Sequence, residues 1–150
     1  MAAPEGRADP IVLVGIDGSE HSLDALRWAA RYARAVGALL RPIVAWSHPA
    51  YTDFVEVPAE EYEPVARADL EDALHLLRSE FSDVAIDPQV VYGLPAAVLI
   101  DASKDADLLV VGTRGHGGFT GMLLGSVSQH CVHHAACPVV VVVRQGREAS

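Results

Sequence analysis

Cysteine is nearly absent from this chain of 150 residues, which contains only Cys131 and Cys137. Two cysteines cannot build the disulfide framework of a small secreted domain, so we expect a reducing compartment and a cytoplasmic location. Long apolar runs are also missing, because no stretch reaches the ~20 residues that a bilayer-spanning helix needs. Residues 1–10 show no apolar run behind basic residues, and we therefore expect neither a signal peptide nor a membrane partner.

Positive charge is scarce as well. Eleven lysines and arginines stand against 20 aspartates and glutamates, which gives a formal net charge of -9. Such a surface repels nucleic acid and anionic membranes, so we expect no nucleic-acid partner. To bind an anionic small molecule, this chain would need a local group of donors, such as exposed backbone amides or a few well-placed cations.

What the chain does have is a regular alternation of apolar strand patterns and amphipathic helix patterns. The patterns predict strands at 11–16, 39–46, 84–92, 107–111 and 138–143, and helices at 20–36, 60–79, 95–104 and 126–136. Pro42 interrupts the second strand, which indicates a sheet edge or a bulge, and Asp87-Pro88 interrupts the third, which indicates a strand near a sheet edge. Strand and helix in alternation imply an α/β fold, a parallel sheet with helices on both faces.

The most informative segment is the glycine loop, residues 112–126, which follows a buried strand and opens a helix. Glycine lets a ligand approach main-chain N–H groups, and the helix N-terminus adds partial positive charge. The loop also contributes the Ser126 hydroxyl and two candidate cations, Arg114 and His116. A turn that merely needs flexible glycines is the alternative interpretation, but the loop holds six of them, at 112, 115, 117, 118, 121 and 125. The pattern therefore predicts a polyphosphate site.

Two familiar phosphate motifs do not match the glycine loop. No Gly-Lys-Ser/Thr follows its glycines, so it is not a P-loop. The dinucleotide fingerprint belongs after the first strand, whereas this loop follows the fourth. Instead, Gly112, Gly115, Gly125 and Ser126 match the pattern Gly-x2-Gly-x9-Gly-Ser/Thr without a gap. This spacing resembles the ATP-binding branch of the universal stress protein family.

The resemblance extends beyond the loop. Residues 12–19 (VLVGIDGS) and 137–142 (CPVVVV) are similar to the first and last strands of that family. The resemblance implies a single universal stress protein domain at 10–144, between a disordered tail at 1–9 and a short tail at 145–150. It also implies a five-stranded parallel sheet in the order 3-2-1-4-5, the Rossmann-like arrangement called adenine nucleotide alpha-hydrolase-like.

In a sheet of that order the ligand crevice lies outside the carboxyl ends of the strands, where the strand order reverses. Asp17 follows the first strand and Gly112 ends the fourth, so both fall at the crevice. The resemblance implies ATP with Mg2+ as ligand and places the nucleotide site at Gly15, Ile16, Asp17, Ala45, Gly112, Arg114, Gly115, Gly125, Ser126, Val127 and Ser128. Asp17 keeps an alternative role in turn and helix-cap chemistry. Arg114 could equally be a plain solvated arginine.

The last strand, Val139–Val143, contains no polar residue and occupies a sheet edge in this order. Soluble proteins avoid an uncovered apolar edge. Pairing with the same strand of a second copy would cover it, so we expect a homodimer, as the resemblance also implies. Cover by another element of the same chain is the alternative.

A cluster of His130, His133, His134 and the two cysteines suggests a metal site. Each helix face offers only two ligands, however, and protein zinc sites use three or four. We therefore expect no metal at this cluster and interpret Cys131 as a small core residue.

Three functions remain open. The first is an ATP-binding stress-response or signalling protein whose nucleotide sets its conformation or choice of partner. The second is a slow ATPase or another nucleotide enzyme, and the third is an interaction protein that does not depend on nucleotide. Phosphoryl transfer needs a residue that orients the nucleophile, and the glycine loop has no lysine, carboxylate or glutamine. The sequence thus favours binding over catalysis and assigns no catalytic residue, while the irregular loop at 47–58 fits a lid or a partner surface.

Overall fold

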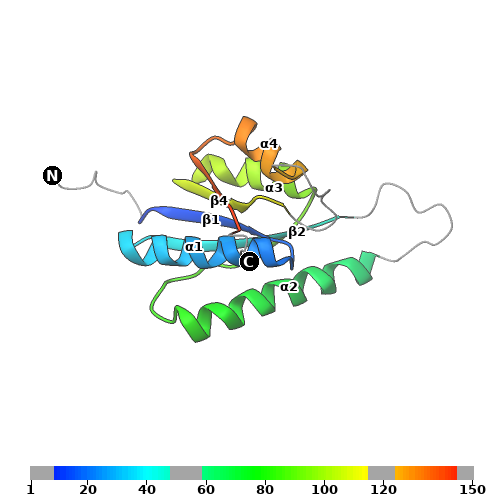
Figure 1. The fold of residues 1–150 in the computed structure, drawn as a ribbon. Helices are drawn as coiled ribbons and strands as arrows, with labels where there is room; N and C mark the ends of the chain where they lie inside the picture. The colour runs from blue at the N-terminus through cyan, green and yellow to red at the C-terminus, as the bar shows by residue number, and fades with distance from the viewer. Residues whose placement is uncertain (1–8, 48–58, 115–123, 145–150) are drawn as a thin grey trace, which may run out of the picture.

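The computed structural model describes residues 9–47, 59–114 and 124–144 (Figure 1). Its strands are β1 (Ile11–Ile16), β2 (Leu39–Trp46), β3 (Gln89–Tyr92), β4 (Leu108–Gly112) and β5 (Val139–Val142). Its helices are α1 (Glu20–Val36), α2 (Ala59–Glu80), α3 (Pro95–Ala102), the short 3-10 turn η1 (Ser103–Asp105) and α4 (Ser126–His134). All neighbouring strands are parallel, and their order is β3-β2-β1-β4-β5. The predicted fold class and strand order are confirmed.

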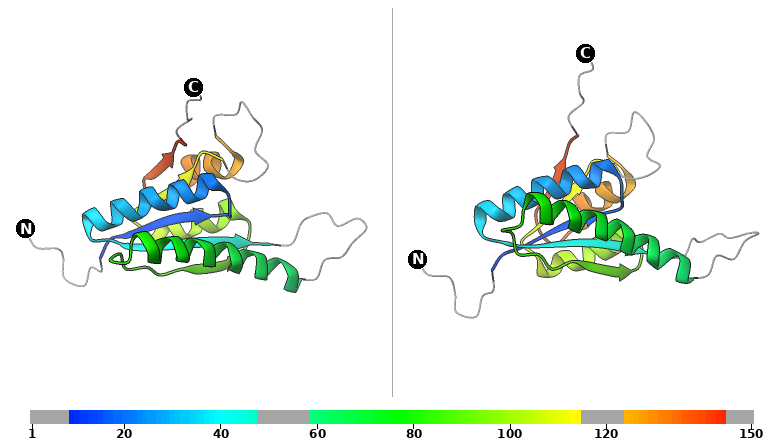
Figure 2. Two further views of the ribbon diagram at one scale, coloured as in Figure 1. Left: turned by 60° about the horizontal axis from the view of Figure 1, so that its bottom comes forward. Right: turned by 90° about the horizontal axis from the view of Figure 1, so that it is seen from below.

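The sheet lies between two helical layers, with α1 and α2 on one face and α3 and α4 on the other (Figures 1 and 2). Side chains of a strand alternate between the two layers. Val12 and Val14 of β1 pack in the core under α1 and α2, whereas Leu13 packs in the core under α3 and α4. Because β1 and β4 are buried on both faces, their sequences are nearly continuous apolar runs.

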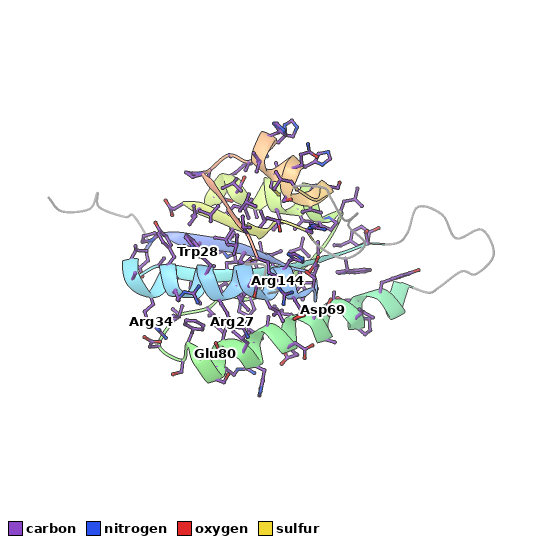
Figure 3. All side chains as sticks on the ribbon, viewed as in Figure 1. Arg27, Trp28, Arg34, Asp69, Glu80 and Arg144 are labelled. Atoms are coloured by element: carbon purple, nitrogen blue, oxygen red, sulfur yellow. The ribbon has the colours of Figure 1, made fainter. Side chains whose placement is uncertain are left out.

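Helix boundaries follow the local signals in the sequence. The Ser19 hydroxyl accepts the Ser22 N–H and caps α1, and the chain leaves that helix through Gly37 with φ +72°. The apolar stripe predicted for α2 is buried in the core: Ala66, Leu70, Ala73, Leu74, Leu77 and Phe81. Along the outer seam between α1 and α2, Arg27 lies 3.5 Å from Glu80, and Arg34 lies 2.9 Å from Asp83 (Figure 3).

The prediction that Pro42 marks an edge or a bulge is wrong, because β2 lies inside the sheet and keeps one register against β1 throughout. On the other side, Leu40 exchanges hydrogen bonds with Ala85 and Asp87, so Pro42 also faces that neighbouring segment. The ladder is interrupted there, between the Leu40–Ile86 bridge and the start of β3 at Gln89. Proline is tolerated at position 42 because its missing N–H falls at this interruption. The interruption also makes β3 shorter than the predicted third strand. As expected, β3 lies at the edge of the sheet.

The two cysteines are structural in character. Cys131 is fully buried in the core under α3 and α4, as interpreted from the sequence, and burial raises the pKa of its thiol to about 11. Burial, aided by the charge of Asp107, also raises the pKa of Cys137. Both thiols therefore stay protonated at neutral pH and are poor nucleophiles. Within the described ranges, no group of three or more His, Cys, Asp or Glu residues could hold a metal ion, and no helix is long and apolar enough to cross a membrane.

Candidate functional site

Strands β1 and β4 lie side by side in the middle of the sheet, with Val12 beside Leu108 and Val14 beside Val110. They run parallel, so their carboxyl ends meet at one edge of the sheet. Here β1 passes into α1 and β4 into the glycine loop. This is the point where the strand order reverses, and it is where open α/β sheets bind their ligands.

The turn from β1 into α1 is held by Asp17. Its Oδ1 atom accepts the Ser19 N–H at 2.9 Å and the Ser19 hydroxyl at 2.5 Å. The Asp17 N–H in turn donates to the Ser22 hydroxyl at 3.3 Å. Asp17 therefore has the turn and cap role that the sequence left open, and both of its bonds to Ser19 end on one carboxylate oxygen.

A second carboxylate, that of Asp69, reaches this turn from α2. One of its oxygens lies 2.7 Å from the place where a Cβ would stand on Gly18. Figure 3 shows Asp69 on the side of α2 that faces the start of α1. The sequence analysis missed this residue. The one sequence feature that could have indicated Asp69 is its helical spacing from two buried residues of α2, three positions after Ala66 and four before Ala73. This spacing places an acidic side chain at the border of the buried stripe.

The two ends of the glycine loop are fastened together by a loop clamp made of Thr113, Gly125 and Ser128. The Thr113 carbonyl accepts the Gly125 N–H at 2.6 Å and the Ser128 hydroxyl at 3.0 Å. Ser128 is 3% exposed, and its hydroxyl also reaches the Gly125 carbonyl at 3.1 Å. The resemblance placed the residue Ser128 at the nucleotide site, and in the structure its hydroxyl is engaged inside the clamp.

The loop clamp places the N-terminus of α4 at the carboxyl edge of the sheet. Gly125 is the N-cap residue and offers no side-chain cap, and the first turn contains no acidic residue. The first N–H groups of any helix lack partners within that helix. Ser126 is exposed and Val127 is half-buried, so the start of α4 presents backbone donors and the positive end of the helix dipole to an anion.

Two of the predicted site glycines have packing partners inside the protein. A Cβ on Gly112 would stand 2.7 Å from the carbonyl oxygen of His21, which is backbone and cannot rotate away. A Cβ on Gly15 would stand 2.8 Å from a methyl group of Leu99, on the opposite face of β1. Close packing against backbone therefore accounts for the glycine at Gly112 without a ligand, whereas the contact at Gly15 involves the end of a flexible side chain and excludes a Cβ less strictly.

The remaining predicted residues are dispersed around the carboxyl edge. Ile16 is buried under α1 and α2, Ala45 packs toward α3 and α4, and Arg114 is half-buried at the start of the glycine loop. Gly115 lies outside the described residues, as do 48–58 and both tails apart from Asp9. The structure thus brings together Asp17, Gly112 and the start of α4, while the side chains of Ile16 and Ala45 lie on opposite faces of the sheet.

Negative charge at the start of α1 is balanced by the end of β5. Arg144 lies 3.1 Å from Glu20 and 3.4 Å from Asp24 (Figure 3). The hydrogen bond and the charge of Glu20 raise the pKa of Arg144 further. This cation reduces the repulsion that an approaching phosphate would meet at the first turns of α1.

Together, the sheet order, the reversal point and the helix N-terminus beside it define a doubly wound α/β protein, a class that binds its ligands at this edge of the sheet. The family model of the universal stress proteins matches residues 10–143. The chain belongs to the universal stress protein family, as its glycine loop and first and last strands suggested.

Individual relatives agree with this family. Over 133 residues the chain is 41% identical to the universal stress protein Rv2005c of Mycobacterium tuberculosis, a match that covers 87% of this chain and 44% of the relative. The chain thus spans about half the length of the curated relatives that it matches.

Solved structures show the same fold. UspA from Lactobacillus plantarum superimposes with a TM-score of 0.69 at 25% identity and covers 91% of this chain and 99% of its own. A universal stress protein solved in complex with cAMP superimposes with a TM-score of 0.68 at 30% identity and covers 93% of this chain and all of its own.

Proposed function

We propose that the chain binds an adenine nucleotide, ATP together with Mg2+, between the ends of β1 and β4. The bound nucleotide sets the protein's conformation or choice of partner in a cytoplasmic stress or signalling response. The observation that carries this proposal is the loop clamp, which holds the donor-rich N-terminus of α4 beside the turn at Asp17. The solved relative at 30% identity whose structure contains cAMP supports the choice of an adenine nucleotide.

The described residues fit a nucleotide with its phosphates at α4. Backbone donors at Ser126 and Val127 suit phosphate oxygens, and the exposed Ser126 hydroxyl adds another donor. Gly125 has φ -76° and ψ +173°, a conformation open to any residue. The backbone conformation therefore does not require glycine at this position. Close approach of a ligand, which a side chain would block, is a reason for glycine here. Asp17 is the carboxylate for the ribose hydroxyls or Mg2+, and Arg114 and Gly115 complete the phosphate end.

The proposal is one of binding without efficient turnover. Asp17 already accepts two hydrogen bonds from Ser19, and neither carboxylate at the β1–α1 turn belongs to the glycine loop. Catalysis of phosphoryl transfer depends on a residue that orients the attacking group. We assign no catalytic residue.

Titration calorimetry with ATP and Mg2+, after extraction of any bound nucleotide, tests the site. We expect saturable 1:1 binding. In the variant Ser126→Glu a carboxylate enters the first turn of α4, where it suits the helix dipole but repels phosphate. Its thermal stability should equal or exceed that of the wild type, while ATP affinity falls at least tenfold.

The matched control is Gln129→Glu, which adds the same charge to the exposed face of α4 about one turn further on. We expect its ATP affinity at physiological salt to stay within about threefold of wild type, because the charge lies about a turn further from the phosphate site. The helix-dipole effect is confined to the first turn, and ions screen a surface charge over roughly 8 Å. Wild-type protein that neither retains nor binds nucleotide would contradict the proposal and favour a nucleotide-independent interaction protein.

We further propose a homodimer through the edge strand β5, in which the predicted range Val139–Val143 pairs with its copy. Side chains of β5 are half-buried and Val143 is 66% exposed, so a partner would bury more apolar surface. The Pro138 carbonyl accepts the Leu109 N–H, so by alternation the Val141 N–H points away from β4. Strand pairing between copies would use this donor.

Sedimentation equilibrium checks the dimer. We expect a concentration-dependent dimer for the wild type and a shift of at least tenfold toward monomer for Val141→Pro, which removes the outward donor. The control Val132→Ala changes an exposed apolar residue on α4 that takes no part in the strand pairing, and it should leave the dimer intact. A wild-type monomer at all concentrations would overturn this arrangement.

A further inference from the structure

Thr113 connects two helices that lie on opposite faces of the sheet. Its hydroxyl oxygen lies 3.4 Å from Nδ1 of His21, in the first turn of α1. Its carbonyl oxygen holds the Gly125 N–H and the Ser128 hydroxyl at the start of α4. Figure 1 shows α1 and α4 on either side of β4, the strand that Thr113 follows. One residue at the carboxyl edge therefore joins the start of α1 to the start of α4.

The contact between His21 and Thr113 is enforced by packing. The preceding residue, Gly112, lies so close to α1 that a Cβ there would stand 2.7 Å from the His21 carbonyl oxygen. Thr113 itself is 9% exposed, so its hydroxyl is largely shielded from water. A hydrogen bond in such a place is stronger than one in bulk water, and an unpaired group there is costly.

We propose that His21 and Thr113 form a positioning pair for the nucleotide site. The ring of His21 holds the Thr113 hydroxyl, and Thr113 in turn sets the position of the loop clamp and of the α4 donors. This inference rests on the proposed nucleotide site and adds a residue of α1 to it. His21 acts through Thr113, and a direct contact between His21 and the ligand is not part of the proposal.

The physical basis is preorganisation. Backbone donors bind an anion well only when they are already oriented, because ordering them during binding costs affinity. Without the His21 contact, the Thr113 hydroxyl would be free to bond elsewhere. Thr113 would then be held less firmly, and so would its carbonyl, which accepts the hydrogen bonds from Gly125 and Ser128. The glycine loop would then begin from a less defined position.

A double-mutant cycle on ATP affinity tests the pair. His21→Leu removes the ring nitrogen at similar volume, and Thr113→Val removes the hydroxyl. Each should weaken ATP binding about five- to tenfold, the size expected for the loss of one hydrogen bond and its ordering effect. The double variant should be no weaker than either single variant, because both remove the same contact.

Two further variants separate positioning from general damage. His21→Asn keeps a hydrogen-bonding atom near the place of Nδ1 and should restore affinity to within about twofold of wild type. His75→Leu makes the same change as His21→Leu on the exposed face of α2 and should have no effect on affinity. Urea unfolding of every variant shows whether the protein remains folded at the titration temperature.

The outcomes are distinct. If the wild type binds ATP and His21→Leu binds equally well, the positioning pair is refuted while the nucleotide site stands. The pair is also refuted if the losses of ATP affinity in His21→Leu and Thr113→Val multiply in the double variant. It is refuted as well if His21→Asn binds ATP as weakly as His21→Leu. If the wild type binds no nucleotide, the proposed function fails and the positioning pair fails with it.

Discussion

Gly112→Ala should destabilise the protein by about 1–3 kcal/mol, the usual cost of forcing an extra methyl group into packed surroundings. The methyl group would meet the carbonyl oxygen and carbon of His21 at 2.7 and 2.9 Å, and both are backbone atoms of α1. Relief requires β4 and the start of α1 to separate. Chemical denaturation should show this loss in a lower midpoint with an unchanged slope.

Gly125→Ala is the matched comparison, because it changes the glycine at the other end of the same loop. Its backbone conformation suits alanine, although alanine is a poorer N-cap than glycine, so we expect the free energy of unfolding to fall by no more than about 1 kcal/mol. ATP affinity should nevertheless fall at least tenfold if a ligand approaches this position closely. A Gly112 variant as stable as wild type would show that the close contact with His21 yields easily. A Gly125 variant with full affinity would remove Gly125 from the proposed site.

Asp17 offers the second large effect, because two substitutions separate its two roles. Asp17→Ala removes the acceptor of the Ser19 N–H and hydroxyl, and Ser19 is only 8% exposed. Loss of these bonds should lower the free energy of unfolding by about 1–2 kcal/mol. Asp17→Asn keeps an Oδ1 acceptor in the same place and loses only the contribution of the charge, so its stability should fall by no more than about 1 kcal/mol.

ATP affinity distinguishes the roles. If the carboxylate contacts ribose or Mg2+, Asp17→Asn should weaken Mg·ATP binding at least tenfold while the protein stays folded, because a charged acceptor binds more strongly than a neutral one. Titrations with and without Mg2+ show which contact is involved. An asparagine variant with wild-type affinity would reduce Asp17 to its turn and cap role.

Local patterns in the sequence predicted most individual elements. Ser19 and Gly37 mark the ends of α1, and the 3.6-residue spacing from Ala66 to Phe81 marks the buried face of α2. These signals work because capping and periodicity depend on near neighbours in the chain. They failed at Pro42, where tolerance of the proline depends on an interruption in the neighbouring segment, which lies far away in the sequence.

The candidate site, too, was predictable where local sequence patterns decide and unpredictable where contacts between distant segments decide. Through the family resemblance, Gly112, Gly125 and Ser126 were expected at the carboxyl edge of the sheet, and in the structure they lie where β4 ends and α4 begins. The engagement of the Ser128 hydroxyl with the Thr113 carbonyl was not predictable, because a hydroxyl one turn into a helix can donate in several directions. Asp69 and His21 were missed because a single acid or histidine at a helix surface has no periodic signature.

The sequence by itself determined the alternation of strands and helices, the burial of β1 and β4 on both faces, and the family. The alternation and the burial follow from composition and periodicity along the chain, and the family from the resemblance of the glycine loop and of the first and last strands. Only the tertiary structure decided which groups meet at the carboxyl edge. Parallel crossovers bring Asp17, the loop clamp and the Asp69 carboxylate of α2 to one edge of the sheet, and distances across that edge depend on how closely α1 packs against Gly112.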